Sequence, residues 1–355
     1  MAAAAACRRP PRRREERVVT SLDTTPRQVP ALGAPTLAER VARVPTPIWV
    51  AYGLTAACLL LLGLSTSNGF DPDRLLRILS NAAPLGVVAI AQTLVIINRG
   101  LDLSVGPVMN TAAILTASLS AASGASLATT LPVVILVGAG IGLVNGVMLA
   151  FTRIPPLLGT LAMATVVQGV NALVTRGQPR GVVPGELRQL ADGRVLGLPF
   201  SASLLVWLGL LVVVGLVLTT TVAGRQFKAV GANPRAAWLS GVPVRSHTLT
   251  AYVASGALAA VAGVLLIAYS GSPSLTAGDS YALNSVVAAV IGGASLAGGH
   301  GGMTGTFAGV AVLAFLTTVL NSYNIPSPVQ LVVNGVVLIL MLLVNSRLAE
   351  RKGRR

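Results

Sequence analysis

The chain has 355 residues, of which 53% are hydrophobic and only 10% are charged, and its formal net charge is +15. Soluble domains average about 25% charged residues, so this composition excludes an ordinary soluble globular protein. Several apolar runs are long enough to cross a bilayer core of about 30 Å as helices. We therefore predict an all-α polytopic membrane protein whose many glycines allow close helix packing.

Positive charge concentrates at the two ends of the chain. Residues 1–47 hold nine arginines against four carboxylates, and residues 347–355 hold five cations against one glutamate. A basic tail can bind nucleic acid, but beside a membrane span it more often fixes topology or contacts anionic lipid. We expect lipid rather than nucleic acid as the partner of both tails, and we expect both tails to be cytoplasmic. The first tail is also expected to be disordered.

Residues 48–346 form the predicted transmembrane domain, with about ten apolar segments. The second and eighth segments are short and interrupted by glycine or proline, so we expect broken or partly spanning helices there, covered by protein or by a water cavity. An even number of spans places both basic termini on one side of the membrane. The segments are 48–65, 83–98, 104–121, 131–151, 157–175, 201–223, 249–270, 283–298, 303–321 and 328–346.

Asp102 lies between the second and third segments, in the stretch NRGLDLSVGP. An ionisable residue near membrane depth is by default a functional candidate. A carboxylate at this position also caps the start of a helix, because the first N–H groups there lack partners. We favour capping and keep the transport role open.

Polar residues inside the other apolar segments have two interpretations. Asn145, Gln168 and Asn171 either hydrogen-bond neighbouring helices or line a polar pathway, and helix–helix bonding is the commoner outcome. A pathway lined by amides would suit hydroxyl-rich ligands. The predicted pathway residues are Gln92, Asn98, Asp102, Asn145, Gln168, Asn171 and Asn284.

The glycine-rich stretch 291–306 does not match a nucleotide-binding loop. That loop requires a lysine directly after its last glycine, and the chain has only Lys228 and Lys352, neither in that context. The glycines instead predict tight turns or close helix approach. His247 and His300 have no carboxylate spaced to form a metal site or a proton relay. We therefore predict no catalytic residue, no metal and no bound cofactor in this chain.

The loop 224–247 carries four cations and no carboxylate between two apolar segments. Asn233 is a preferred N-cap, Pro234 suits the first helical position, Gly241 suits the C-terminal cap and Pro243 prevents continuation. A helix of about two turns is unstable alone in water, so either the membrane domain or another protein must stabilise it.

Five collinear motifs resemble one family. They are GLDLSVG at 100–106, NG with RIPP at 145–156, TLAMATVVQG at 160–169, AVGANPRAAWLSGV at 229–242 and VIGGASLAGGHGGMTGTFAG at 290–309. Over about residues 80–345 the chain resembles the membrane permease subunit of bacterial ABC importers, in the ribose/xylose-type monosaccharide (branched-chain amino acid/sugar) permease family. The tail 1–47 lies outside that common core.

The resemblance implies a monosaccharide importer in the bacterial plasma (inner) membrane. Its partners would be a separate ABC ATPase that binds ATP and Mg²⁺, a second permease subunit in a homodimer, and an extracytoplasmic sugar-binding protein. It also implies a cytoplasmic coupling helix that docks on the ATPase. Pro234, Arg235 and Trp238 depart from the family's charge pattern there. The implied coupling residues are Ala229, Gly231, Asn233, Ala236, Ala237, Leu239, Ser240 and Gly241.

Two other classes compete with this interpretation. A secondary active transporter or channel for a small polar solute requires an ionisable group at mid-membrane, and Asp102 is the one candidate, at a segment edge. A membrane scaffold or enzyme would leave the capped cytoplasmic helix unexplained. The importer permease accounts for more of the sequence than either.

The ten-span topology makes a direct prediction. A reporter that is active only in the cytoplasm, fused after Arg355, should be active, because both basic tails are expected on that side. A reporter that is active only outside the membrane serves as the control at the same position. Activity of the external reporter would contradict the ten-span arrangement.

Overall fold

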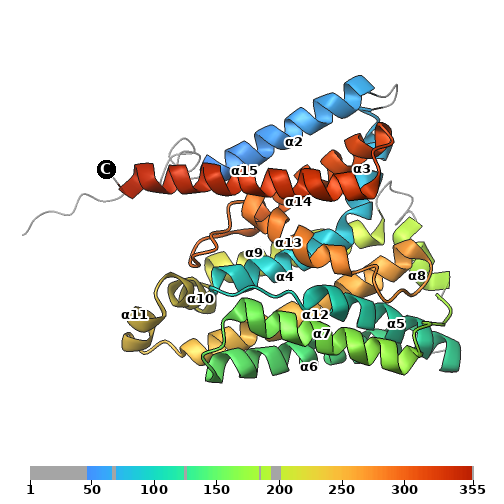
Figure 1. Ribbon diagram of the computed structural model, residues 1–355, viewed down its shortest axis with the longest axis horizontal. Coiled ribbons are helices and arrows are strands. Elements are labelled where there is room, and N and C mark those ends of the chain that lie inside the picture. The colour runs from blue at the N-terminus through green and yellow to red at the C-terminus, as the bar shows by residue number, and fades with distance from the viewer. Residues whose placement is uncertain (1–45, 66–68, 124–125, 184, 193–200, 354–355) are drawn as a thin grey trace, which may run out of the picture. The chain divides into compact units, whose positions relative to one another are not determined.

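The computed structural model describes residues 46–65, 69–123, 126–183, 185–192 and 201–353, all within the compact unit Val44–Arg355. These residues form helices and turns, with no β-strand among them, so the all-α prediction is confirmed. The helices in Figure 1 are α2 Thr46–Ser65, α3 Pro72–Asn81, α4 Ala83–Ile97, α5 Val105–Ser123, α6 Leu127–Phe151, α7 Pro156–Thr175, α8 Gly185–Asp192, α9 Ala202–Thr220, α10 Val222–Ala232, α11 Pro234–Leu239, α12 Val244–Ser270, α13 Asp279–Ile291, α14 Met303–Ser322 and α15 Ser327–Gly353.

Each of the ten predicted segments corresponds to a helix. Within the described residues, α6, α7, α9, α12 and α14 are long and apolar enough to cross a membrane, and α3 with α4 makes a sixth span bent by 51°. The apolar parts of α2, α5, α13 and α15 are shorter. The second predicted segment, 83–98, is the continuous helix α4, and the bend lies before it, at the junction with α3. The eighth, 283–298, contains the second part of the 13-residue helix α13, which ends at Ile291. The chain is therefore a polytopic, multi-pass membrane protein.

The predicted tails are only partly described. Of the N-terminal tail 1–47, residues 1–45 lie outside the described residues. The predicted C-terminal tail 347–355 begins inside α15, which continues to Gly353. Their disorder and their side of the membrane remain predictions.

Helix α12 forms the centre of the bundle and packs along α6, α4 and α5. Its contact with α6 is made by glycines: a Cβ on Gly138 would lie 2.5 Å from the Gly256 carbonyl oxygen, and a Cβ on Gly142 would collide with the Tyr252 carbonyl. The two backbones therefore touch, as the glycine content predicts. In lipid such contacts replace the hydrophobic drive that packs helices in water.

The start of α2 and the end of α15 lie at the same end of the bundle. The Tyr52 hydroxyl donates to the Thr304 carbonyl at the start of α14 (3.3 Å), whereas Gln330, near the start of α15, donates to Asn321 at the end of α14 (2.7 Å). Figure 1 shows α10 and α11 at the end of the bundle where α15 finishes, and α8 at the opposite end. We call the end with α11 the coupling end.

The glycine contact predicts a selective loss of stability. Gly138→Ala should cost about 1–3 kcal/mol, because its methyl group overpacks against the α12 backbone. Gly140→Ala in the same helix is the control: a Cβ there meets nothing within 4 Å. Alanine favours a helix over glycine by about 1 kcal/mol, so the control should be neutral or stabilising. Thermal unfolding of the purified protein in detergent measures the stability of both variants. Equal unfolding temperatures for the two would contradict the close contact at Gly138.

Candidate functional site

Helix α11 has the two predicted caps. The Asn233 side-chain oxygen accepts hydrogen bonds from the N–H groups of Arg235 and Ala236, both at 3.1 Å. At the other end Gly241 is left-handed, with φ +80°. The N–H groups of Gly241 and Val242 donate to the carbonyls of Trp238 and Ala237 at 3.0 Å, which is the Schellman pattern. The short capped helix is confirmed, and its partner-binding role is a separate question.

The outer face of α11 is apolar and unusually exposed. Trp238 is 67% exposed and Leu239 72% exposed, whereas Ala237 lies beneath them and is 6% exposed. The predicted coupling residues therefore fall into two groups, since Ala237 and Gly231 are buried and the others are exposed. Trp238 is absent from that set because it departs from the family's pattern; its exposure is visible only in the fold. The exposed members are Ala229, Asn233, Ala236, Leu239, Ser240 and Gly241.

Gly231 belongs to a contact of three chain segments at the coupling end. A Cβ on Gly231 would collide with the Ile97 carbonyl and lie 2.7 Å from the Gly299 nitrogen. The Gly299 N–H donates to the Ile97 carbonyl (2.8 Å), and Arg99 Nε donates to the Ala297 carbonyl (2.8 Å). We call these five residues the backbone junction. It joins the end of α10, the end of α4 and the glycine-rich loop before α14.

Glycine conformation makes this junction possible. Gly298 and Gly299 have φ values of +84° and +74°, which L side chains rarely adopt, and a Cβ on Gly299 would lie 2.7 Å from the Ala232 backbone. The prediction that the glycines provide tight turns and close approach is confirmed for this loop.

Asp102 is buried in a polar cluster between α4 and α5. Its side chain accepts hydrogen bonds from the Ser104 N–H (3.0 Å), the Ser104 hydroxyl (2.6 Å) and the Ser255 hydroxyl of α12 (2.8 Å). It is only 1% exposed. Asp102 therefore forms a turn with Ser104, directly before α5, and ties that loop to α12. Its role as a cap of the first turn of α5 stays a prediction.

Two more predicted pathway residues join this cluster. Asn145 of α6 donates to the Ser104 hydroxyl at 2.9 Å. Gln92 of α4, with its amide nitrogen toward the Asp102 carbonyl, donates to that oxygen (3.1 Å) and accepts from the Asp102 N–H (3.3 Å). Both side chains are fully buried. The structure thus brings three of the seven predicted residues together, and each bonds neighbouring elements.

The other four predicted pathway residues are dispersed. Asn98 accepts from Thr248 (3.2 Å), and Asn171 accepts from Thr111 (3.0 Å). Asn284 of α13 accepts from Asn334 of α15 at 3.5 Å. Gln168 is exposed on α7. A pathway role for these residues stays a prediction.

Asn110 in α5 is a further buried polar residue that the sequence interpretation did not single out. It donates to the Leu275 carbonyl (2.7 Å) and to Asp279 (2.9 Å), and it accepts from the Gly278 N–H (2.7 Å). Asn110 therefore fixes the start of α13 within the bundle. The sequence could have indicated this residue, because Asn110, like Asn145, is an amide inside an apolar segment.

Metal ligation has no visible basis in the described part of the chain, where no three His, Cys, Asp or Glu residues are grouped closely enough to hold an ion. What the arrangement offers is a membrane bundle with a capped, exposed helix at one end. A backbone junction links that end to the broken spans. These features fit a membrane transport subunit.

The chain belongs to the family of permease components of branched-chain amino acid transport systems, whose family model matches residues 74–342. It is 34% identical to the ribose import permease protein of Escherichia coli (strain K12), over 83% of this chain and 92% of that protein. The ribose import permease protein of Bacillus subtilis (strain 168) is 32% identical, over 81% and 89%. The galactofuranose transporter permease protein of Escherichia coli (strain K12) is 35% identical, over 76% and 79%. No solved structure shows significant similarity to the chain.

The Asp102 cluster predicts a stability effect. Ser255→Ala removes the donor to one carboxylate oxygen of a buried group and should cost about 1–3 kcal/mol. Ser246→Ala, on the exposed start of the same helix, is the control and should change little. Thermal unfolding in detergent compares the two variants. If Ser255→Ala unfolds at the same temperature as the control, the Ser255–Asp102 hydrogen bond does not contribute to stability.

Proposed function

We propose that this chain is the transmembrane permease subunit of an ATP-binding cassette importer for a monosaccharide. The exposed, doubly capped helix α11 carries the proposal. Trp238 and Leu239 turn a large apolar surface outward at the coupling end, where a separate motor protein would bury it. Burial of large exposed apolar side chains, aromatic ones above all, is what dominates protein–protein contacts.

The substrate class comes from the relatives. Two are named for ribose import and one for galactofuranose transport, so a pentose or a related sugar is the proposed cargo. An extracytoplasmic binding protein would deliver it, and a second copy of the permease would complete the pathway. The chain contains no nucleotide-loop lysine, so ATP and Mg²⁺ would bind to the ATPase partner.

The backbone junction supports a way for movement of the ATPase partner to reach the substrate pathway. Only Asn233 separates α10 from α11, and Gly231, in the last turn of α10, packs against Ile97 and Gly299 without room for a side chain. A displacement of α11 would therefore move the end of α4 and the loop between α13 and α14 with it. α4 belongs to the bent span and α13 is a short apolar helix, and transporters commonly place their substrate sites at discontinuous helices of this kind.

The proposed orientation places the coupling end in the cytoplasm. Arg225, Lys228, Arg235 and Arg245 lie in the coupling loop, and both basic tails adjoin the terminal helices. A cytoplasmic excess of arginine and lysine is the usual signature of topology. The coupling surface would then face the compartment that contains ATP, in the bacterial plasma membrane.

Leu239→Asp tests the docking surface. It places a charge on the exposed apolar face without altering either cap, so ATPase binding in pull-down and sugar uptake in reconstituted vesicles should both fall, by roughly tenfold or more for a central contact. Val182→Asp is the matched control: Val182 is also an exposed apolar residue (63%) but lies in the segment before α8, away from the coupling end.

The purified permease alone should show no ATPase activity above background.

Unchanged ATPase binding by Leu239→Asp, with normal uptake, would overturn the role of α11. Loss of binding by both variants would instead indicate misfolding. Comparison of their thermal midpoints separates that outcome from a lost contact.

A further inference from the structure

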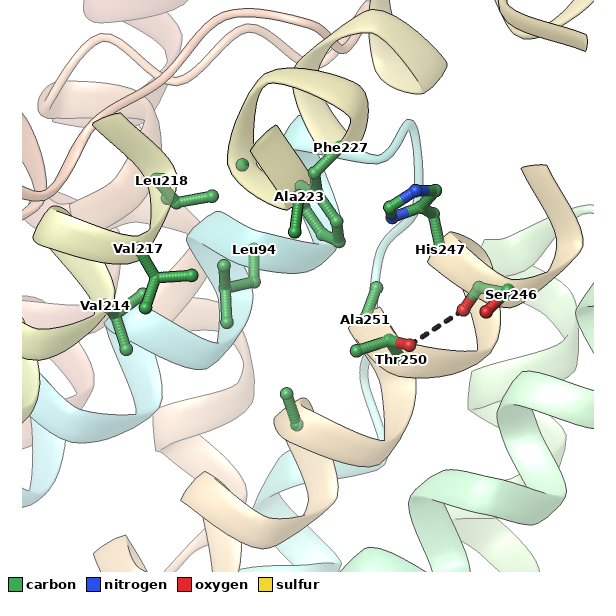
Figure 2. Close-up of a pocket in the computed structure, with 12 residues that line it drawn as sticks. Leu94, Val214, Val217, Leu218, Ala223, Phe227, Ser246, His247, Thr250 and Ala251 are labelled. Atoms are coloured by element: carbon green, nitrogen blue, oxygen red, sulfur yellow. Dashed lines mark hydrogen bonds between the residues drawn. The ribbon is translucent and has the colours of Figure 1, made fainter. Parts of the chain in front are cut away.

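An apolar pocket of about 330 Å³ lies beside the coupling loop, a size within the range of small-ligand sites. Figure 2 shows Val214, Val217 and Leu218 of α9 on one side, Phe227 of α10 above, and His247 of α12 opposite. Leu94 of α4 closes the inner wall. The pocket is thus bounded by the helices on both sides of α11.

The wall formed by α9 is continuous with an exposed apolar face. Val217 lines the pocket and is itself 46% exposed, and its neighbours Val213 and Leu216 are 58% and 55% exposed. Because α9 is apolar enough to cross a membrane, this face contacts lipid chains in a bilayer. The pocket therefore opens where acyl chains are present at high concentration.

Polar groups are confined to the α12 side. Thr250 already donates to the Ser246 carbonyl at 2.8 Å. His247 packs edge-on against Phe227, with ring centroids 6.1 Å apart, and its Nε2 is buried without a hydrogen-bond partner. The pocket thus offers largely apolar walls, with the His247 ring and the Ser246 side chain as polar groups on the α12 side.

Cations lie next to the pocket-lining residues along the chain. Three of the lining residues are each followed or preceded by a cation in the sequence: Gly224 by Arg225, Phe227 by Lys228, and Ser246 by Arg245. Between Asp192 and Asp279 the chain contains no carboxylate. An apolar span that ends in uncompensated cations matches the transition from acyl chains to anionic headgroups.

We propose that this pocket binds one acyl chain of an anionic phospholipid, with its headgroup held by Arg225 and Lys228. Arg225 donates to the Thr220 carbonyl at the end of α9 (3.2 Å), which uses one of its five N–H donors. The Arg245 guanidinium lies 5.1 Å from the Phe151 ring centroid and is therefore engaged on another side. A lipid in this position wedges α10 apart from α12 and so sets the position of α11. That last consequence rests on the proposed function, whereas lipid binding itself does not.

Binding is measured on the purified permease alone, by native mass spectrometry after delipidation and titration with phosphatidylglycerol or with phosphatidylcholine of the same chains. We expect one phosphatidylglycerol per chain to bind more tightly than any phosphatidylcholine. Val217→Trp should fill the mouth of the pocket and weaken this binding roughly tenfold. Val213→Trp, one turn earlier on the same helix and outside the pocket lining, should leave it unchanged.

The double change Arg225→Gln with Lys228→Gln gives an independent measurement, because Arg225 is exposed and Lys228 half-buried, so neither belongs to the hydrophobic core. It should weaken phosphatidylglycerol binding roughly fivefold for each cation removed, the factor that corresponds to about 1 kcal/mol per charge. Phosphatidylcholine binding should not change. The charge variant remains decisive if Val217→Trp does not fold.

Equal binding of the two lipids, or equal loss in the two tryptophan variants, would overturn the proposal. So would a pocket covered by a second copy of the chain, in which case no lipid is retained and Val217→Trp changes the oligomeric state. Failure of lipid binding with normal ATPase docking would leave the importer function intact.

Discussion

Contact between backbone atoms at the coupling end is the constraint on which the rest of the architecture depends. Membrane helices can be interrupted only where other protein groups satisfy and cover the freed backbone. Here the carbonyl at the end of α4 accepts the Gly299 N–H, and Gly231 approaches from the other side with no side chain between them. The end of α4, the end of α10 and the glycine-rich loop before α14 are therefore in direct backbone contact.

Buried polar residues perform a complementary task in the interior. Asp102, Gln92 and Asn145 each bond elements distant in the chain, so the loop before α5 is fixed to α4, α6 and α12. Asn110 fixes the start of α13 in the same way. The centre of the bundle is held by directional bonds and close glycine contacts, while α11 is attached through its neighbours α10 and α12. This division suits a subunit whose outer helix must respond to a partner.

The sequence predicted features that depend on local chemistry better than features that depend on which way a helix faces. The caps of α11 follow from Asn233, Pro234 and Gly241, because capping is decided within one turn. Gln168 and Asn171 lie three residues apart on α7, yet one is exposed and the other buried. No local pattern separates them, since orientation is set by the packing of α5 against α7. The exposure of Trp238 is likewise a property of the assembled bundle, which the sequence pattern does not show.

The glycine contact between α6 and α12 also determines how freely this sequence can vary. At Gly138 and Gly142 the neighbouring backbone leaves no volume for any side chain, so every substitution carries a steric cost. On the outward face of the same helix, Leu136 is 70% exposed and needs only to remain apolar. Mutational tolerance along α6 should therefore alternate with the helical turn, and a saturation library would separate the packed face from the lipid face without further structural information.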